Sequence, residues 1–159
     1  MCDLCDDPSR SFDDYLDLMR GKVERYGWAL QYVEGDALWS SFAYTIGLTP
    51  HGLPELLVTG VPRDQLGMRL NGPAALCLRD GVPPEPGSRR SFADGVLTEA
   101  VPVAQPWWHL RIATMFYGTD VRATQLVWQD ERGRWPWDPA FREGRGGQPV
   151  LGPRARRVA

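Results

Sequence analysis

The chain has few of the side chains on which most catalytic and metal sites depend. Its 159 residues include two histidines and three cysteines, so acid–base catalysts for neutral pH and soft metal ligands are scarce. The sequence also lacks a phosphate-binding loop, a dinucleotide-binding glycine motif, a zinc-protease motif and a serine-hydrolase elbow. These absences lower the expectation of an enzyme without excluding one.

Long apolar runs and a large excess of one charge are missing as well. No stretch reaches the roughly 18 apolar residues of a membrane span, and the N-terminus is acidic, unlike that of a signal peptide. The formal net charge of −2 argues against a dedicated nucleic-acid binder. We therefore expect a cytoplasmic protein with no membrane or nucleic-acid partner. Its protein or small-molecule ligand and its oligomeric state stay open.

The cysteines are too few for a disulfide framework. Cys2 and Cys5 form a C-x-x-C pair near the N-terminus, but a structural zinc site needs four ligands. The other soft candidates are Cys77, His51 and His109. Cys2 and Cys5 therefore have three interpretations: incidental cysteines, a zinc site or a redox pair. Zinc is not favoured.

What is present is the composition of one globular domain, with 43% hydrophobic and 24% charged residues. We expect this domain to span residues 1–138. Residues 139–159 are rich in glycine, proline and arginine, and are expected to lie along the domain or stay disordered. Residues 132–159 hold seven arginines, which either attract the acidic N-terminus or meet phosphate or an acidic partner.

Hydrophobic periodicity predicts an α+β fold with a mixed, mainly antiparallel sheet of about five strands and two or three packed helices. Ser11 and Asp14 resemble a capping box before the first helix. Asn71-Gly72-Pro73 predicts a kinked or two-piece helix, and residues 80–90 have the composition of an exposed loop. The expected helices are 12–26, 63–79 and 106–117, and the expected strands are 28–33, 42–47, 55–61, 97–103 and 122–129.

The central hairpin, residues 42–62, carries the candidate catalytic residues. Two apolar strands flank a connector with two prolines and a glycine, which places His51 and Glu55 near each other at a strand end. In this hypothesis His51 is the general acid or base and Glu55 orients it. The alternative is plain turn chemistry with a solvated carboxylate. Hydrogen bonds to a substrate would come from Tyr44, Thr45 and Asn71.

Trp128, Trp135 and Trp137 form a second candidate site. A turn at residues 130–133 brings the last two rings back towards Trp128. Such rings usually pack to close one end of a sheet, but they can also form an aromatic wall for a flat ligand or a partner's side chain.

Four segments carry a family resemblance: MCDLCDDP, FAYTIGLTPHGLPELLVTGVP, QLVWQDERGRWPWDP and GQPVLG. Together they resemble a bacterial family known as domain of unknown function 4262, over nearly the whole chain. The resemblance implies a shared fold and no particular chemistry. The order of strands and helix is also similar to that of suppressor-of-fused-like domains, some of which act as toxin-immunity or protein-binding modules.

From these features we expect a non-catalytic binding or interaction module of an immunity-like or regulatory kind. The alternatives are a small enzyme that uses His51 and Glu55, and a metal or thiol protein that uses Cys2 and Cys5.

Overall fold

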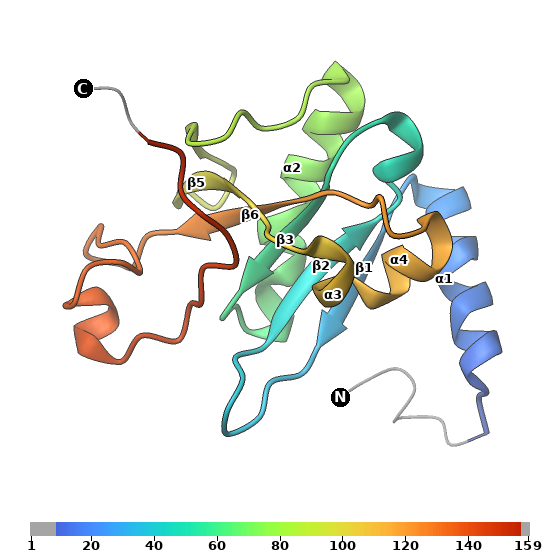
Figure 1. Cartoon of the computed structure of the whole chain (residues 1–159), viewed down its shortest axis with the longest axis horizontal. Helices are drawn as coiled ribbons and strands as arrows, with labels where there is room; N and C mark the ends of the chain where they lie inside the picture. The colour runs from blue at the N-terminus through green and yellow to red at the C-terminus, as the bar shows by residue number, and fades with distance from the viewer. Residues whose placement is uncertain (1–8, 157–159) are drawn as a thin grey trace.

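One six-stranded sheet forms the centre of the computed structural model, which describes residues 9–156 (Figure 1). The strands lie in the order β1-β2-β3-β6-β5-β4. Every neighbouring pair is antiparallel except β3 and β6, which are parallel. The predicted α+β fold with a mixed, mainly antiparallel sheet is confirmed. The strands are β1 (Ala29–Val33), β2 (Phe42–Ile46), β3 (Glu55–Thr59), β4 (Arg89–Ser91), β5 (Leu97–Pro102) and β6 (Ala123–Trp128).

Helices cover both faces of the sheet. In Figure 1, α2 lies behind the strands, whereas α3 and α4 lie in front of them. None of the helices within the described residues is long and apolar enough to cross a membrane. The helices are α1 (Phe12–Tyr26), α2 (Leu66–Asp80), α3 (Pro106–His109) and α4 (Arg111–Tyr117).

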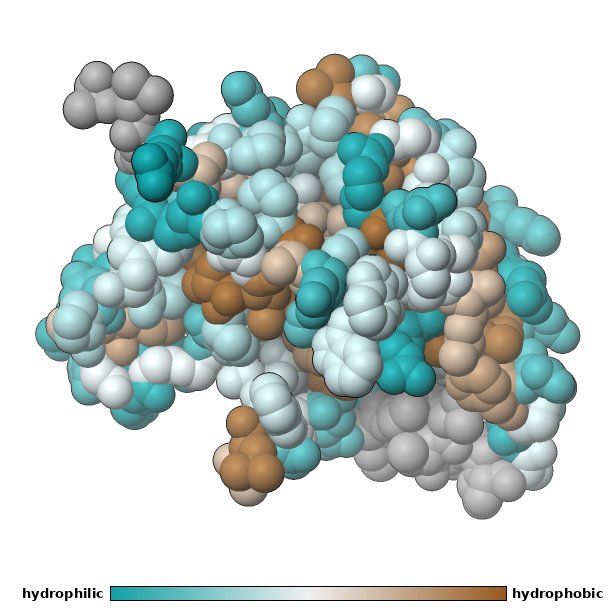
Figure 2. Space-filling view, in the orientation of Figure 1, coloured by the Kyte–Doolittle hydropathy of each residue, from teal (hydrophilic) through white to brown (hydrophobic). Residues whose placement is uncertain are grey.

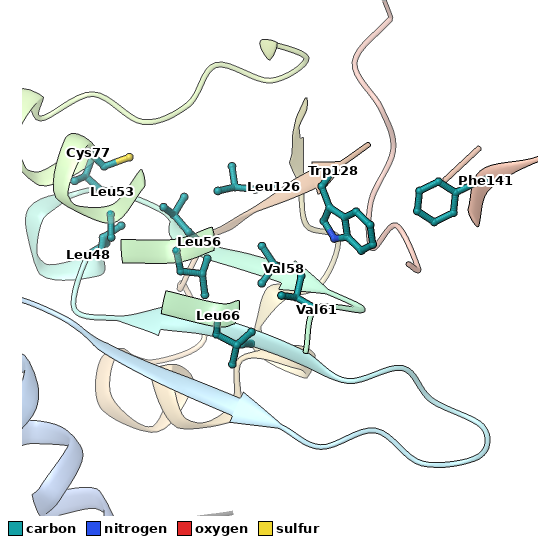
Figure 3. Close-up of a cluster of buried hydrophobic side chains, with 13 residues drawn as sticks. Leu48, Leu53, Leu56, Val58, Val61, Leu66, Cys77, Leu126, Trp128 and Phe141 are labelled. Atoms are coloured by element: carbon teal, nitrogen blue, oxygen red, sulfur yellow. The ribbon is translucent and has the colours of Figure 1, made fainter. Parts of the chain in front are cut away.

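The core divides between these two faces because side chains alternate along each strand. Leu56 and Val58 of β3 join the cluster under α2, which Figure 3 shows in close-up. Leu57, between them, joins the cluster on the other face with Met19 of α1 and Ile112 of α4. All five residues of β3 are buried, as expected for a strand covered on both sides.

The sheet has one strand more than expected. Strand β4 lies at the end of the segment 80–90, which was predicted to be an exposed loop. It pairs with β5, with Arg89 opposite Glu99 and Ser91 opposite Leu97. All three residues of β4 are polar, so they lack the alternation of apolar and polar residues that predicts a strand. Only the pairing with β5 identifies β4 as an edge strand.

Two helices also differ from the expectation. Helix α2 is continuous through Pro73, because burial of Leu70, Pro73 and Ala74 outweighs the backbone hydrogen bond that proline cannot make. The helix expected over residues 106–117 is broken at Leu110, whose ψ of 61° is not helical.

The C-terminal segment, residues 146–154, crosses the front of β5 and β6 (Figure 1). The Gln148 side chain exchanges two hydrogen bonds of 2.8 Å with the backbone N–H and C=O of Trp128. Further on, the buried Glu99 carboxylate of β5 accepts hydrogen bonds of 2.9 Å from Arg89 and Arg154. These polar contacts hold the segment against β5 and β6.

Candidate functional site

Glu55, at the start of β3, is a fully buried carboxylate that holds the β2–β3 connection together. Its oxygens accept hydrogen bonds of 2.7 Å from the hydroxyl groups of Thr45 and Thr49. They also accept bonds of 2.9–3.1 Å from the backbone amides of Gly47, Leu48 and Thr49. Because all these donors except Thr45, which lies in β2, belong to the connection, the geometry makes Glu55 its anchor.

His51 lies in the same connection, in the 3-10 helix η1 (Thr49–His51), but it is exposed. Within residues 9–156, no hydrogen bond or ion pair joins its ring to Glu55 or to another carboxylate. The two residues are close in the chain, yet the carboxylate is committed to the turn. The catalytic role of this pair stays a prediction, and the function proposed below does not depend on it.

The other polar residues of the catalytic hypothesis also have partners inside the protein. The Tyr44 hydroxyl is buried and accepts a hydrogen bond of 3.0 Å from the amide of Ile112, and burial raises the pKa of Tyr44. The Asn71 side-chain oxygen accepts a bond of 3.0 Å from the Trp28 indole. Their expected contacts with a substrate stay a prediction.

The three tryptophans lie near one end of the sheet but do not form one wall. Trp128 is buried, with its ring centre 5.6 Å from that of Phe141 (Figure 3). Trp135 is also buried and stacks on Trp137, with ring centres 5.2 Å apart and an angle of 10° between the rings. The Arg154 guanidinium covers Trp137 at 3.4 Å from its centre. Ring packing accounts for these contacts, and an aromatic wall for a ligand stays a prediction.

Other aromatic side chains are more exposed than these three. Leu38 and Trp39 lie in the loop between β1 and β2, which forms a hydrophobic projection in Figure 2. Trp107 and Trp108 are exposed on α3. The sequence did not single them out, because exposure is set by what packs on an element and not by residue type.

A cavity of about 610 Å³ lies where the parallel strands β3 and β6 both end. Ligands of open sheets with parallel strands commonly bind at the carboxyl ends of those strands. The walls come from the residues after β3, the first turn of α2, the turn before β5, the residues after β6 and the 3-10 helix η3 (Phe141–Gly144). We call it the arginine cavity because five arginines line it, namely Arg69, Arg132, Arg134, Arg142 and Arg145.

Arg69, on α2, places its guanidinium in a nearly buried part of this wall. The side chain is 14% exposed, and the guanidinium carbon lies 5.4 Å from the centre of the Trp128 ring. Burial lowers the pKa of Arg69, whereas the Asp94 charge, 3.2 Å from Nε, opposes this effect. Nε and Nη1 are buried and make no hydrogen bond within residues 9–156. Nη1 has no acceptor at all among these residues, and a buried donor without one costs about 1–3 kcal/mol, so an acceptor bound in the cavity would remove this cost.

Asp130 organises another wall of the arginine cavity. Its carboxylate accepts hydrogen bonds of 2.8–2.9 Å from the amides of Arg132, Arg134 and Arg142, and from Nε of Arg134. Burial of the carboxylate favours its neutral form, but these hydrogen bonds outweigh burial and lower the pKa of Asp130 to about 2. The Asp130 carboxylate therefore stays ionised and keeps this wall rigid at neutral pH.

Backbone strain marks the same wall. Arg142 and Glu143 have φ angles of 47° and 60°, and Gly144 follows with 81°. Two adjacent non-glycine residues in the left-handed region cost roughly 1–2 kcal/mol each, and such strain gathers at functional sites. The hydrogen bond from the Arg142 amide to Asp130 helps to hold this conformation.

The Asp130 network predicts a pH dependence of stability. Because the folded pKa lies below the usual value of 3.8, the carboxylate stabilises the fold above pH 4 and loses this effect as pH falls towards 2. Asp130→Asn should therefore lower the free energy of unfolding at pH 7, and the difference from the wild type should shrink between pH 4 and pH 2. Urea unfolding at a series of pH values measures this. A difference that does not change with pH would contradict the ionised role of Asp130.

No metal site can be assigned in the described part of the chain. Cys2 and Cys5 lie outside the described residues. Within residues 9–156, no group of three or more His, Cys, Asp or Glu side chains is placed to hold a metal ion. Cys77 is buried in the cluster under α2, where burial raises the pKa of its thiol.

Sequence reasoning missed Arg69, Asp94 and Asp130 as site residues. The one sequence signal for an anion site was the number of arginines in residues 132–159. Contact with phosphate or an acidic partner was one of two interpretations of these arginines. Nothing in the helical pattern of residues 63–79 distinguished Arg69 from other polar positions.

Comparison with known proteins identifies one relationship. Residues 22–142 match the family model described as Domain of unknown function (DUF4262). The matched span includes Arg69, Asp130 and Arg142, and it ends before Arg145 and the C-terminal segment. Neither the curated proteins nor the solved structures contain a match to the chain.

Proposed function

Because the chain belongs to the family described as domain of unknown function 4262, whose description gives no activity, we propose a function from the arginine cavity: the protein is a binding module for a small anionic ligand. The observation that carries this proposal is Arg69, a nearly buried guanidinium in the cavity wall whose Nε pairs with Asp94 at 3.2 Å and whose Nη1 has no hydrogen-bond partner among the described residues. The volume of about 610 Å³ lies within the range of small-molecule sites.

An anion suits this wall for two reasons. Arginine presents a planar set of donors that matches carboxylate and phosphate oxygens, and charge-assisted hydrogen bonds are stronger in a water-poor site. The carboxylates around the cavity are also partly neutralised by the protein itself. Asp94 lies against Arg69 and Asp130 against Arg134, so they compete little for a ligand's place.

Binding accounts for the lining better than catalysis does. Among the described residues, the cavity lining contains no His, Cys, Ser, Thr, Tyr or Lys side chain, so it offers no imidazole, hydroxyl, thiol or amine for acid–base or nucleophilic catalysis. The Asp130 carboxylate, with its low pKa, is a poor proton acceptor. A regulatory or immunity-like role, as in the suppressor-of-fused-like domains, would then follow from ligand binding.

The test compares two arginines on the same helix. Citrate, sulfate and inorganic phosphate are titrated into the full chain by calorimetry, and the shift in Tm is measured in parallel. We expect at least one anion to bind, and Arg69→Met to weaken it by a factor of about ten or more, since a hydrogen bond to a charged group is lost. Arg79→Met is the control, because this substitution removes the same charge from the same helix. Arg79 is exposed and pairs with Asp80, away from the cavity lining.

A further variant shows whether Arg69→Met loses binding because the protein no longer folds. Arg69→Lys keeps a positive charge beside Asp94 but not the planar set of donors, so it should fold and still bind weakly. Binding of none of the three anions, or equal losses in the Arg69 and Arg79 variants, would refute the proposed function.

A further inference from the structure

The ligand class can be narrowed further, on the basis of the anion site proposed above. We infer that the arginine cavity binds a phosphate monoester of a hydroxylated, non-aromatic compound, the class to which sugar phosphates belong. Three features of the lining point to it: several guanidinium groups, the lack of an exposed aromatic face, and two polar side chains that make no hydrogen bond to other described residues.

The lining offers several guanidinium groups to one ligand, with five arginines against the four carboxylates Asp94, Asp130, Glu131 and Glu143. Arg69 pairs with Asp94 at 3.2 Å, but its buried Nη1 has no hydrogen-bond partner among the described residues. The exposed guanidinium groups of Arg132 and Arg145 share one carboxylate, Glu143, at 3.5 and 3.9 Å. A phosphate monoester brings up to two negative charges and three terminal oxygens, so it can meet several guanidinium groups at once.

A nucleobase finds no exposed aromatic ring to stack on among the described residues of this cavity. Trp128 is the one aromatic residue among the described lining residues, and it is buried. The Arg69 guanidinium lies over its ring at 5.4 Å, and the Phe141 ring centre is 5.6 Å away. Stacking of a base would therefore depend on guanidinium groups, and four of the five in the lining pair with carboxylates, so the site favours a ligand without a ring to stack.

The remaining polar groups suit hydroxyl groups. Gln65 and Glu131 line the cavity, and their side chains make no hydrogen bond to other described residues. A free carboxylate repels a bare anion but accepts hydrogen bonds from hydroxyl groups. The combination of several guanidinium groups with a free carboxylate and an amide therefore matches a ligand that carries both phosphate and hydroxyl groups.

The experiment measures separately how the phosphate group and the hydroxylated part of such a ligand contribute to binding. Glucose 6-phosphate, glucose, inorganic phosphate, citrate and AMP are titrated into the full chain by calorimetry. We expect glucose 6-phosphate to bind about tenfold or more tightly than inorganic phosphate, citrate or AMP, and glucose to bind least. Gln65→Ala should weaken glucose 6-phosphate about fivefold, as for one neutral hydrogen bond, and leave the affinity for inorganic phosphate unchanged.

The outcomes distinguish this inference from the function on which it rests. If AMP or citrate binds most tightly, the inference is wrong, although the anion site stands. Equal weakening of glucose 6-phosphate and inorganic phosphate by Gln65→Ala would also overturn it, because the side chain would then not contact the hydroxylated part. If no anion binds, both the inference and the proposed function fail.

Discussion

Replacement of Glu55 by alanine is expected to lower the free energy of unfolding by about 3–5 kcal/mol, at the upper end for a single substitution. The carboxylate is fully buried and accepts hydrogen bonds from Gly47, Leu48 and Thr49 amides. Without it, two or more buried amides lose a charge-assisted bond and have no water to replace it. Urea unfolding monitored by tryptophan fluorescence measures the loss.

Two further variants separate hydrogen bonding from the mere loss of a glutamate. Glu24→Ala, on the exposed side of α1, removes the same side chain and should change stability by less than about 0.5 kcal/mol. Glu55→Gln keeps the size but turns one acceptor into a donor facing other donors, so it should also destabilise. Wild-type stability in Glu55→Ala would show that the carboxylate does not hold the β2–β3 connection.

Gly60→Ala is expected to cost about 3 kcal/mol, the second large effect. Gly60 has a φ of +68°, and a Cβ placed on it would lie 2.1 Å from the carbonyl oxygen of Gly147. The left-handed conformation costs about 1–2 kcal/mol for alanine, and displacement of the C-terminal segment adds a similar amount. Since Gly60 also lines the arginine cavity, this variant should bind anions more weakly.

Gly52→Ala provides a matched control for backbone conformation. Gly52 has a φ of +73°, but a Cβ there would have no atom within 4 Å. It should therefore cost only the conformational part, about 1 kcal/mol. Equal losses of stability at Gly60 and Gly52 in thermal or urea unfolding would mean that the contact with Gly147 contributes nothing.

Local patterns in the sequence predicted the elements whose contacts are themselves local. Ser11 and Asp14 form the capping box that begins α1, with reciprocal hydrogen bonds of 3.0 and 3.1 Å. The alternating residues of 42–47 and the apolar run that follows became the antiparallel strands β2 and β3. These features depend on neighbours within a few residues, which the periodicity of the chain records directly.

The candidate site depended on contacts that no local pattern records. His51 and Glu55 are four positions apart, yet Glu55 is bound into the turn while His51 is exposed, because buried donors compete for the carboxylate. Arg69, Asp94 and Trp128 come from a helix, a turn and a strand.

The sequence by itself therefore determined the fold class and most elements of this protein. The tertiary structure decided which charged side chains share a cavity, because the parallel pairing of β3 with β6 brings together the residues that follow two strands distant in sequence. It also decided that the C-terminal segment lies against the sheet, since its partners Trp128 and Glu99 lie in β6 and β5. Hydrophobic periodicity specifies which face of an element is buried, but strand order and register specify which polar groups then meet.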